Sequence, residues 1–177
     1  MTYNLAATPR ICFRQLLTDE EETGYGVIIE AVDWLREKRI KMWEHPLPGS
    51  VYSKRQESAQ NYGRFVDGEL AVIASLVSAP SSWTDLVGEE NAPWLSTLAT
   101  ARAFRGRQLG RRTVEEICTH LEARGHPALY LDCGSPFLEA YYLSLGFAVV
   151  EVRVRRINRP PVPAYDCECT LMRRPLP

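Results

Sequence analysis

A block of twelve residues, 101–112, is the part of this chain best suited to chemistry, because it holds five arginines and no acidic residue. Gly106 and Gly110 lie among these arginines. Glycines let backbone N–H groups approach a phosphate closely, and a helix that begins in the block adds partial positive charge at its N-terminus. The block therefore predicts a pyrophosphate site. The alternative is that these arginines are solvent-exposed charges at the start of the helix and bind no ligand. The arginines that would add whole charges are Arg105, Arg107 and Arg111.

Other phosphate-bearing ligands fit the sequence less well. The block has neither the G-K-[ST] tripeptide of a P-loop nor a G-x-G-x-x-G after the preceding strand, which argues against nucleotide hydrolysis and dinucleotide binding. The whole chain carries 21 Lys and Arg against 22 Asp and Glu, a net charge of −1, whereas nucleic-acid binders usually show a basic excess. We therefore expect no nucleic-acid partner. Basic clusters at 102–112 and 153–159 keep that alternative open, and it predicts a steep salt dependence of DNA binding.

Length and composition are those of one soluble globular domain over residues 1–177. The chain is 45% hydrophobic and 24% charged, and 177 residues can bury one sizeable core. No apolar run approaches the roughly 18 residues of a membrane span, and no apolar h-region follows the first basic residue. We expect a cytoplasmic protein without a membrane partner.

The cysteines fit a reducing compartment. They are five in number and irregular in spacing, which favours reduced thiols over a disulfide framework. Cys167 and Cys169 form a C-x-C, but no second pair of Cys or His follows at the spacing of a zinc site. We expect no metal site.

Hydrophobic periodicity and turn residues predict seven strands and three main helices, an α/β chain in the order β-α-β-β-β-α-β-α-β-β. This order implies a mixed sheet with helices on both faces. Asp67-Gly68 marks a hairpin, Thr18 and Glu21 have capping-box spacing, and Ser135-Pro136 has the pattern of a helix start. The predicted strands are residues 11–16, 64–66, 70–78, 94–100, 128–132, 147–154 and 166–172, and the predicted helices begin after Thr18, near Leu109 and at Phe137.

Two motifs resemble those of the GNAT superfamily of acyl-CoA-dependent N-acyltransferases. Residues 105–110 are similar to its R/Q-x-x-G-x-G/A pyrophosphate loop, and Tyr142-Leu-Ser-Leu-Gly146-Phe147 is similar to its Y-x-x-x-G-F element. The motifs come in the family's order, and the predicted elements match its fold. The resemblance implies a mixed, mostly antiparallel sheet of about six to seven strands flanked by helices, and transfer of an acetyl group from acetyl-CoA to a primary amine of a small molecule or peptide.

The resemblance also implies where coenzyme A binds. Its pyrophosphate would lie against the arginine-rich loop, and its pantetheine would pair with the backbone near the end of the strand at 94–100, like an added strand. Two positions depart from the family pattern. Gln108 stands where glycine is usual and would be strained at positive φ, and Ser135 replaces an asparagine near the pantetheine and could act only as a helix cap. The cofactor-binding residues implied are Leu98, Ala99, Thr100, Arg105, Gly106, Arg107, Gln108, Leu109, Gly110, Arg111 and Ser135.

Tyr142 is the candidate catalytic acid. An attacking amine must be neutral, and the departing thiolate needs a proton, which a phenol with a pKa near 10 can donate to a sulfur whose thiol pKa is about 8.5. The alternative is a core aromatic, and Tyr141 is expected to be a packing partner. Cys133 ends a predicted strand nearby, but no His is close in sequence to activate it, so we do not expect a covalent role.

No general base is evident, because no Asp, Glu or His lies between residues 93 and 114. Asp85, Glu89, Glu90 and a water relay remain candidates, while His120 and His126 are expected to be exposed bystanders. Trp43, Glu44 and His45 are weak acceptor-binding candidates, with loop packing as the alternative.

Two further interpretations follow from the same resemblance. A non-catalytic acyl-CoA-binding regulatory module would keep the fold without turnover, and the missing base together with Gln108 favours it. A homodimer could also form through the final strand and the proline-rich loop at 158–165, as in many relatives of the family.

Overall fold

The computed structural model describes residues 8–39, 46–58, 60–88, 92–157 and 164–177. Its strands form one seven-stranded sheet in the order β1-β2-β3-β4-β5-β7-β6, in which only β4 and β5 are paired in parallel. This confirms the expected α/β class and mostly antiparallel sheet. The strands are β1 (Ile11–Gln15), β2 (Asn61–Val66), β3 (Glu69–Ser78), β4 (Pro93–Thr100), β5 (Ala128–Cys133), β6 (Ala148–Ile157) and β7 (Tyr165–Pro175), and the helices are α1 (Glu21–Glu37), α2 (Gly49–Glu57), α3 (Thr84–Val87), α4 (Leu109–Glu122) and α5 (Pro136–Leu143).

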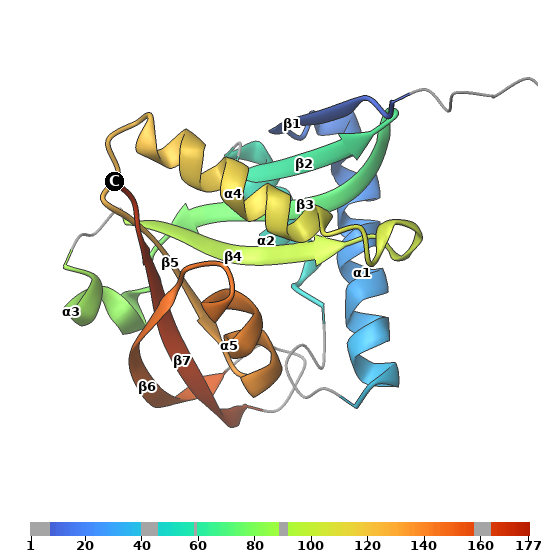
Figure 1. The fold of residues 1–177 in the computed structure, drawn as a ribbon. Coiled ribbons are helices and arrows are strands. Elements are labelled where there is room, and N and C mark those ends of the chain that lie inside the picture. The colour runs from blue at the N-terminus through green and yellow to red at the C-terminus, as the bar shows by residue number, and fades with distance from the viewer. Residues whose placement is uncertain (1–7, 40–45, 59, 89–91, 158–163) are drawn as a thin grey trace, which may run out of the picture.

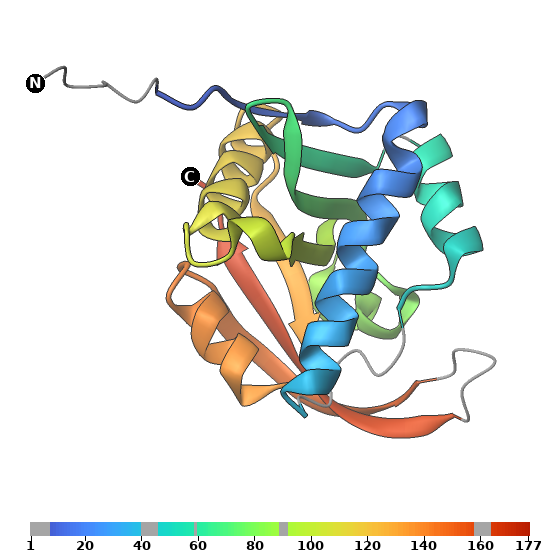
Figure 2. The same ribbon diagram turned by 90° about the vertical axis from the view of Figure 1, so that its right-hand side faces the viewer.

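Helices cover both faces of the sheet. Figures 1 and 2 show α4 and α5 on one face and α1 and α2 on the other. The amphipathic α4 buries Val114, Ile117 and Leu121 against the sheet, as its periodicity predicts, and α1 buries Val27 and Ile28 on the opposite side. The sheet therefore forms the middle layer, and its loops and strand ends are left to build a site.

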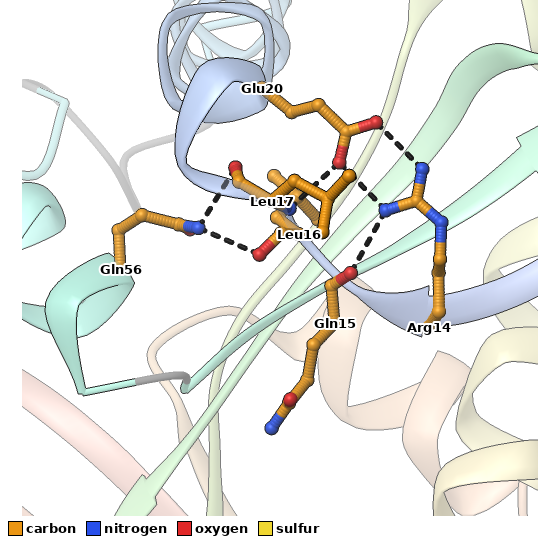
Figure 3. Close-up of polar contacts among 6 residues, drawn as sticks. All are labelled: Arg14, Gln15, Leu16, Leu17, Glu20 and Gln56. Atoms are coloured by element: carbon orange, nitrogen blue, oxygen red, sulfur yellow. Dashed lines mark hydrogen bonds and ion pairs between the residues drawn. The ribbon is translucent and has the colours of Figure 1, made fainter.

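The junction of β1 with α1 corrects the expected capping box by one residue. Glu20, not Glu21, reaches back: its Oε2 accepts the backbone N–H of Leu17 at 2.8 Å, and its carboxylate also pairs with Arg14 at 2.7 Å. A 3₁₀ turn at Thr18–Glu20 precedes the helix and shifts the pattern. Figure 3 also shows Gln56 of α2, whose Nε2 donates to the carbonyls of Leu16 and Leu17 at 2.8 and 3.1 Å. These bonds fix the end of β1 to both helices.

The predicted hairpin is confirmed. β2 and β3 are joined by Asp67 and Gly68, which have φ values of 53° and 88° and so form the kind of turn that joins antiparallel strands tightly. Short helical segments at Ser81–Trp83 and α3 lie between β3 and β4, and Trp83 is completely buried there.

The C-terminal strands extend beyond the lengths expected from periodicity. β7, the final strand, pairs with β6 over Tyr165–Arg173 and with β5 over Thr170–Pro175. β6 is the outermost strand at this end of the sheet. All five cysteines are free thiols. Within the described ranges, no helix has the length and apolarity needed to span a bilayer.

Candidate active site

The site begins at a gap between the two parallel strands. β4 and β5 are in register only at Trp94 and Tyr130, and Figure 1 shows them diverging from there toward their C-terminal ends. On the other side of β4, pairing with β3 shifts between Ser75 and Leu76, so that Ser96 is an extra residue, a β-bulge. A bulge bends its strand and increases its twist, which favours the separation of β4 from β5.

Leu98 and Thr100 present backbone polar groups to this gap. The N–H of Ala101 donates to the carbonyl of Ala71 on β3 at 2.9 Å. Backbone directions alternate along an antiparallel pair, so Ala99 also faces β3, whereas Leu98 and Thr100 face away from it. On the side away from β3, no described strand pairs with β4 at these two residues. Their N–H and C=O groups are therefore available to an extended ligand.

The arginine-rich block forms one wall of a cavity of about 500 Å³ at the end of β4. Gly106 and Gln108 both have positive φ, 77° and 56°, so the expected strain at Gln108 is present. Gln108 is the N-cap residue of α4 but makes no side-chain capping bond, and the first turn of the helix opens beside the cavity. The lining comprises Leu98, Thr100, Phe104, Arg105, Gly106, Gln108, Leu109, Gly110, Arg111, Phe137, Leu138, Tyr141 and Tyr142.

The three expected arginines have different surroundings. Arg105 lines this cavity and the neighbouring one described below. Arg111 lines the same wall, with its guanidinium donating to the carbonyl and hydroxyl of Ser144 at 3.1 and 2.8 Å. Arg107 is absent from both linings and lies over the ring of Phe104, 5.2 Å from its centroid. Of the three, Arg105 is therefore best placed to reach a ligand in both cavities.

A second cavity of about 300 Å³ lies against α1. Five residues are common to the two linings, so the cavities adjoin across the β4 edge at Leu98, Thr100, Arg105, Leu138 and Tyr142. The wall found only in this second cavity comprises Glu30, Ala31, Trp34, Leu35, Leu95, Ser96, Thr97, Ala99, Arg102, Asp132 and Cys133.

Tyr142 lies where the cavities adjoin. Its side chain is 9% exposed and packs edge-on against Tyr141 and Phe147, with centroid distances of 5.2 and 5.5 Å. Burial raises the pKa of its phenol above the usual value, so the hydroxyl stays protonated. Tyr142 therefore combines the core packing considered above with a place in both linings. Tyr141 is its packing partner, as expected.

Ser135 and Cys133 follow each other at the end of β5. Ser135 occupies the N-cap of α5, and its carbonyl accepts the N–H groups of Leu138 and Glu139, but its hydroxyl makes no capping bond. The hydroxyl is thus not used in the cap. Cys133 is buried, and burial raises the pKa of its thiol to about 11, which keeps it protonated and weakens it as a nucleophile.

The carboxylates near the site are mostly engaged. Asp132 pairs with Arg155 and accepts the indole N–H of Trp83 at 3.2 Å. Asp85, a candidate base, forms two bonds to Arg153 at 2.8 and 3.1 Å, which lower the pKa of its carboxyl, and it lines neither cavity.

Glu30 is a third carboxylate near the site. It accepts the backbone N–H of Arg102 at 3.1 Å and faces the second cavity. Trp34 lies one helical turn further along α1 and lines the same cavity. Sequence reasoning missed this wall, although the i, i+4 spacing of a carboxylate and an indole was a usable signal.

The remaining candidates lie elsewhere. Trp43, Glu44, His45, Glu89 and Glu90 fall outside the described residues. His120 and His126 were expected to be exposed but are half-buried. The ring of His120 packs edge-on against Tyr62 with a centroid distance of 6.1 Å, and burial lowers its pKa. In the described ranges, no group of three His, Cys, Asp or Glu could hold a metal ion.

Comparison with known proteins agrees with this geometry. Residues 28–147 match the family model described as the acetyltransferase (GNAT) family. A curated relative, the uncharacterized N-acetyltransferase YesJ of Bacillus subtilis, is 28% identical over 138 residues, which cover 73% of this chain and 77% of YesJ.

Solved structures share the fold. A GNAT family acetyltransferase from Listeria monocytogenes has a TM-score of 0.73 at 19% identity, with 94% of this chain and 95% of that one covered. The YncA protein of Salmonella typhimurium, solved with its cofactor acetyl-CoA, has a TM-score of 0.68 at 15% identity, with 95% of each chain covered. Because the family model spans more than half of the sequence, from α1 to the residue that precedes β6, the chain belongs to the GNAT family of acetyltransferases.

Proposed function

We propose that this acetyltransferase moves an acetyl group from acetyl-CoA directly to a primary amine of a small molecule or peptide. The observation that carries the proposal is the pair of cavities that adjoin at Tyr142, one against the arginine-rich loop and one against α1. A direct transfer needs two ligands bound at once, with their reacting ends together. Two adjoining cavities provide that arrangement.

The residues of the larger cavity fit coenzyme A. The N–H groups at the start of α4, together with Gly106 and Gly110, suit a pyrophosphate, and Arg105 adds a charge-assisted contact. The free backbone groups of Leu98 and Thr100 suit the amides of pantetheine, which would extend the sheet as a further strand. The unused hydroxyl of Ser135 is a further donor at the end of β5.

Tyr142 supplies the proton that the reaction requires. When bound, acetyl-CoA supplies a thioester: a C–N bond forms to the amine, the C–S bond breaks, and the sulfur leaves with the electron pair. The Tyr142 hydroxyl remains protonated because burial raises its pKa, so it can donate to that sulfur. The proton lost by the nitrogen passes to water, and the phenol is reprotonated from solvent, which balances the step.

The acceptor amine enters from the α1 side. Trp34 offers an aromatic face and Glu30 a carboxylate, and both attract an ammonium group before it loses its proton. Asp132 shares the cavity, but its ion pair with Arg155 and its bond from Trp83 make it a poor base. The proton of the amine therefore leaves through Glu30 and water, and not through the loop carboxylates Asp85, Glu89 and Glu90.

The direct test measures thiol release from acetyl-CoA with a panel of amino acids, polyamines, aminoglycosides and peptides. Tyr142→Phe is expected to lower kcat by about 10²-fold or more, while the Kd for acetyl-CoA changes little. Tyr141→Phe is the matched control, because it removes a hydroxyl from the neighbouring ring, and kcat is expected to stay near that of the wild type. Equal kcat values for Tyr142→Phe and the wild type would show that Tyr142 only packs in the core and donates no proton. Acetyl-CoA binding without turnover on any amine would support the non-catalytic module.

A further inference from the structure

Arg64 on β2 is a buried cation beneath the first half of α4, which lies across this part of the sheet (Figure 1). The residue is only 4% exposed, in the interface where α4 buries Val114 and Ile117. A buried guanidinium is costly unless it is paired, and an apolar side chain in its place is often no less stabilising. Packing alone therefore does not explain an arginine at this position.

The guanidinium of Arg64 is bonded to two side chains of α4. Its Nε donates to Thr113 Oγ1 at 2.9 Å, and a terminal nitrogen pairs with the carboxylate of Glu116. The side chain of Glu116 is 47% exposed, whereas Thr113 is completely buried. The bond to Thr113 is therefore shielded from water, where a charge-assisted hydrogen bond is strongest.

Thr113 connects Arg64 to the first turn of α4. Its hydroxyl accepts from Arg64 and donates to the carbonyl of Leu109 at 2.9 Å. Leu109 is the first residue of the helix, and its carbonyl belongs to the same planar peptide group as the N–H of Gly110. That N–H is among the four at the start of a helix that have no partner within it. The chain of bonds from Arg64 thus ends at a peptide whose N–H is free for a ligand.

The Leu109–Gly110 peptide is part of the cavity wall. Both residues line the larger cavity. A Cβ at Gly110 would lie 3.2 Å from the hydroxyl of Tyr141 and 3.4 Å from Oγ1 of Thr100, and these two residues line the same cavity. The absence of a side chain therefore lets this peptide approach a ligand closely.

We infer that Arg64 and Thr113 are positioning residues for the pyrophosphate of acetyl-CoA. They hold the first turn of α4 in place and polarise the Leu109–Gly110 peptide, because hydrogen bonds in a chain strengthen one another. The N–H of Gly110 becomes a stronger donor to a bound anion as a result. Arg64 and Thr113 line neither of the two cavities, so they act through the helix without touching the ligand. The inference rests on the cofactor site proposed above.

A pair of substitutions at Thr113 tests the inference. Thr113→Val keeps the shape of the side chain but removes the hydroxyl, whereas Thr113→Ser keeps the hydroxyl. Thr113→Val is expected to raise the Kd for acetyl-CoA about 3–10-fold, the worth of one hydrogen bond, and Thr113→Ser is expected to bind like the wild type. The KM for acetyl-CoA is expected to rise in Thr113→Val with kcat nearly unchanged, since the binding contact is the same in the ground state and the transition state.

A ligand without pyrophosphate separates positioning of the anion site from a general loosening of α4. S-acetylpantetheine carries the thioester and the pantetheine but neither the pyrophosphate nor the adenosine. Its Kd, measured by titration calorimetry, is expected to be equal in the wild type and Thr113→Val. Arg64→Met removes the charge and is expected to raise the Kd for acetyl-CoA at least as much as Thr113→Val does.

Val114→Ala is the matched control for a weakened helix. It deletes buried methyl groups next to Thr113 in α4, so the Tm is expected to fall while the Kd for acetyl-CoA stays near that of the wild type. A rise in this Kd equal to that of Thr113→Val would show that any loss of packing under α4 weakens binding, and would overturn the inference.

Two other results would overturn the inference while leaving the cofactor site intact. One is an equal Kd for acetyl-CoA in Thr113→Val and Thr113→Ser. The other is an equal loss of affinity for acetyl-CoA and S-acetylpantetheine in Thr113→Val. If the wild type bound acetyl-CoA no more tightly than S-acetylpantetheine, the pyrophosphate would have no site on the protein, and the proposed cofactor site would fall together with the inference.

Discussion

Gln108 is a non-glycine residue in the left-handed region, and Gln108→Gly is expected to stabilise the protein. Its φ and ψ of 56° and 21° cost a residue with a Cβ about 1–2 kcal/mol relative to glycine. The new glycine also raises the conformational entropy of the unfolded chain, which offsets about 0.4–1 kcal/mol of the stabilisation gained by relieving that strain. Gln108 is exposed and makes no capping bond, so no native contact is lost. The net expectation is a gain of about 0.5–1 kcal/mol in the free energy of unfolding.

Calorimetry and urea titration measure this gain. A change of 1 kcal/mol shifts the Tm of a chain of this size by about 2–4 °C, so we expect a rise of about 1–4 °C. Gln108→Ala is the matched control: it removes the same side chain but keeps the Cβ, and its Tm is expected to stay near that of the wild type. Gly106→Ala is expected to move the other way by about 1 kcal/mol, because its φ is 77° although a Cβ there would meet no atom within 4 Å.

The contrast between these variants isolates backbone strain. If Gln108→Gly and Gln108→Ala had equal Tm values, the Cβ at this position would carry no strain, and the reasoning would be refuted. A fall in the affinity for acetyl-CoA in Gln108→Gly would also contradict it, because glycine keeps the loop conformation available.

Two other predictions concern ligand binding and pH. Arg105→Ala is expected to raise the Kd for acetyl-CoA at least about 10-fold, because a charge-assisted contact is lost. Arg107→Ala is expected to change this Kd little, since Arg107 lies over Phe104 outside both cavities. Equal changes in Kd for the two variants, measured by titration calorimetry, would contradict this assignment. The pH profile of kcat is expected to rise as the amine loses its proton and to show no fall up to about pH 10, because burial raises the pKa of Tyr142 and its phenol stays protonated. If kcat fell from about pH 8 in the wild type but not in Tyr142→Phe, the pKa of the Tyr142 phenol would be lowered, which contradicts this prediction.

The sequence alone was enough to predict the elements that depend on local residue patterns. The strand that ends at Thr100, the arginine-rich loop and the helix that begins at Leu109 all lie where periodicity and glycine spacing predict. The family resemblance rested on the loop at 105–110 and on the later element Tyr142–Phe147, and the family model confirms it. The one-residue error at the β1–α1 junction has a local cause too, because a 3₁₀ turn moves the capping carboxylate from Glu21 to Glu20.

The features that the sequence did not predict depend on contacts between distant segments. The gap beside β4 exists because β5 pairs with β7 along its length but meets β4 only at Trp94 and Tyr130. No spacing within β4 reveals this. The cavity wall of Glu30 and Trp34 likewise needs α1 to pack beside the start of the arginine-rich block, where Glu30 accepts the backbone N–H of Arg102. The different surroundings of Arg105 and Arg107 are set by Phe104, whose ring Arg107 covers.

Initial-rate kinetics with both substrates varied test the central claim most directly. Direct transfer from bound acetyl-CoA to an amine requires a complex of all three components, so reciprocal plots are expected to intersect, and protein quenched during turnover is expected to keep its unmodified mass. Parallel plots, together with an acetyl group on Cys133 in the quenched protein, would show transfer through the enzyme and contradict the account.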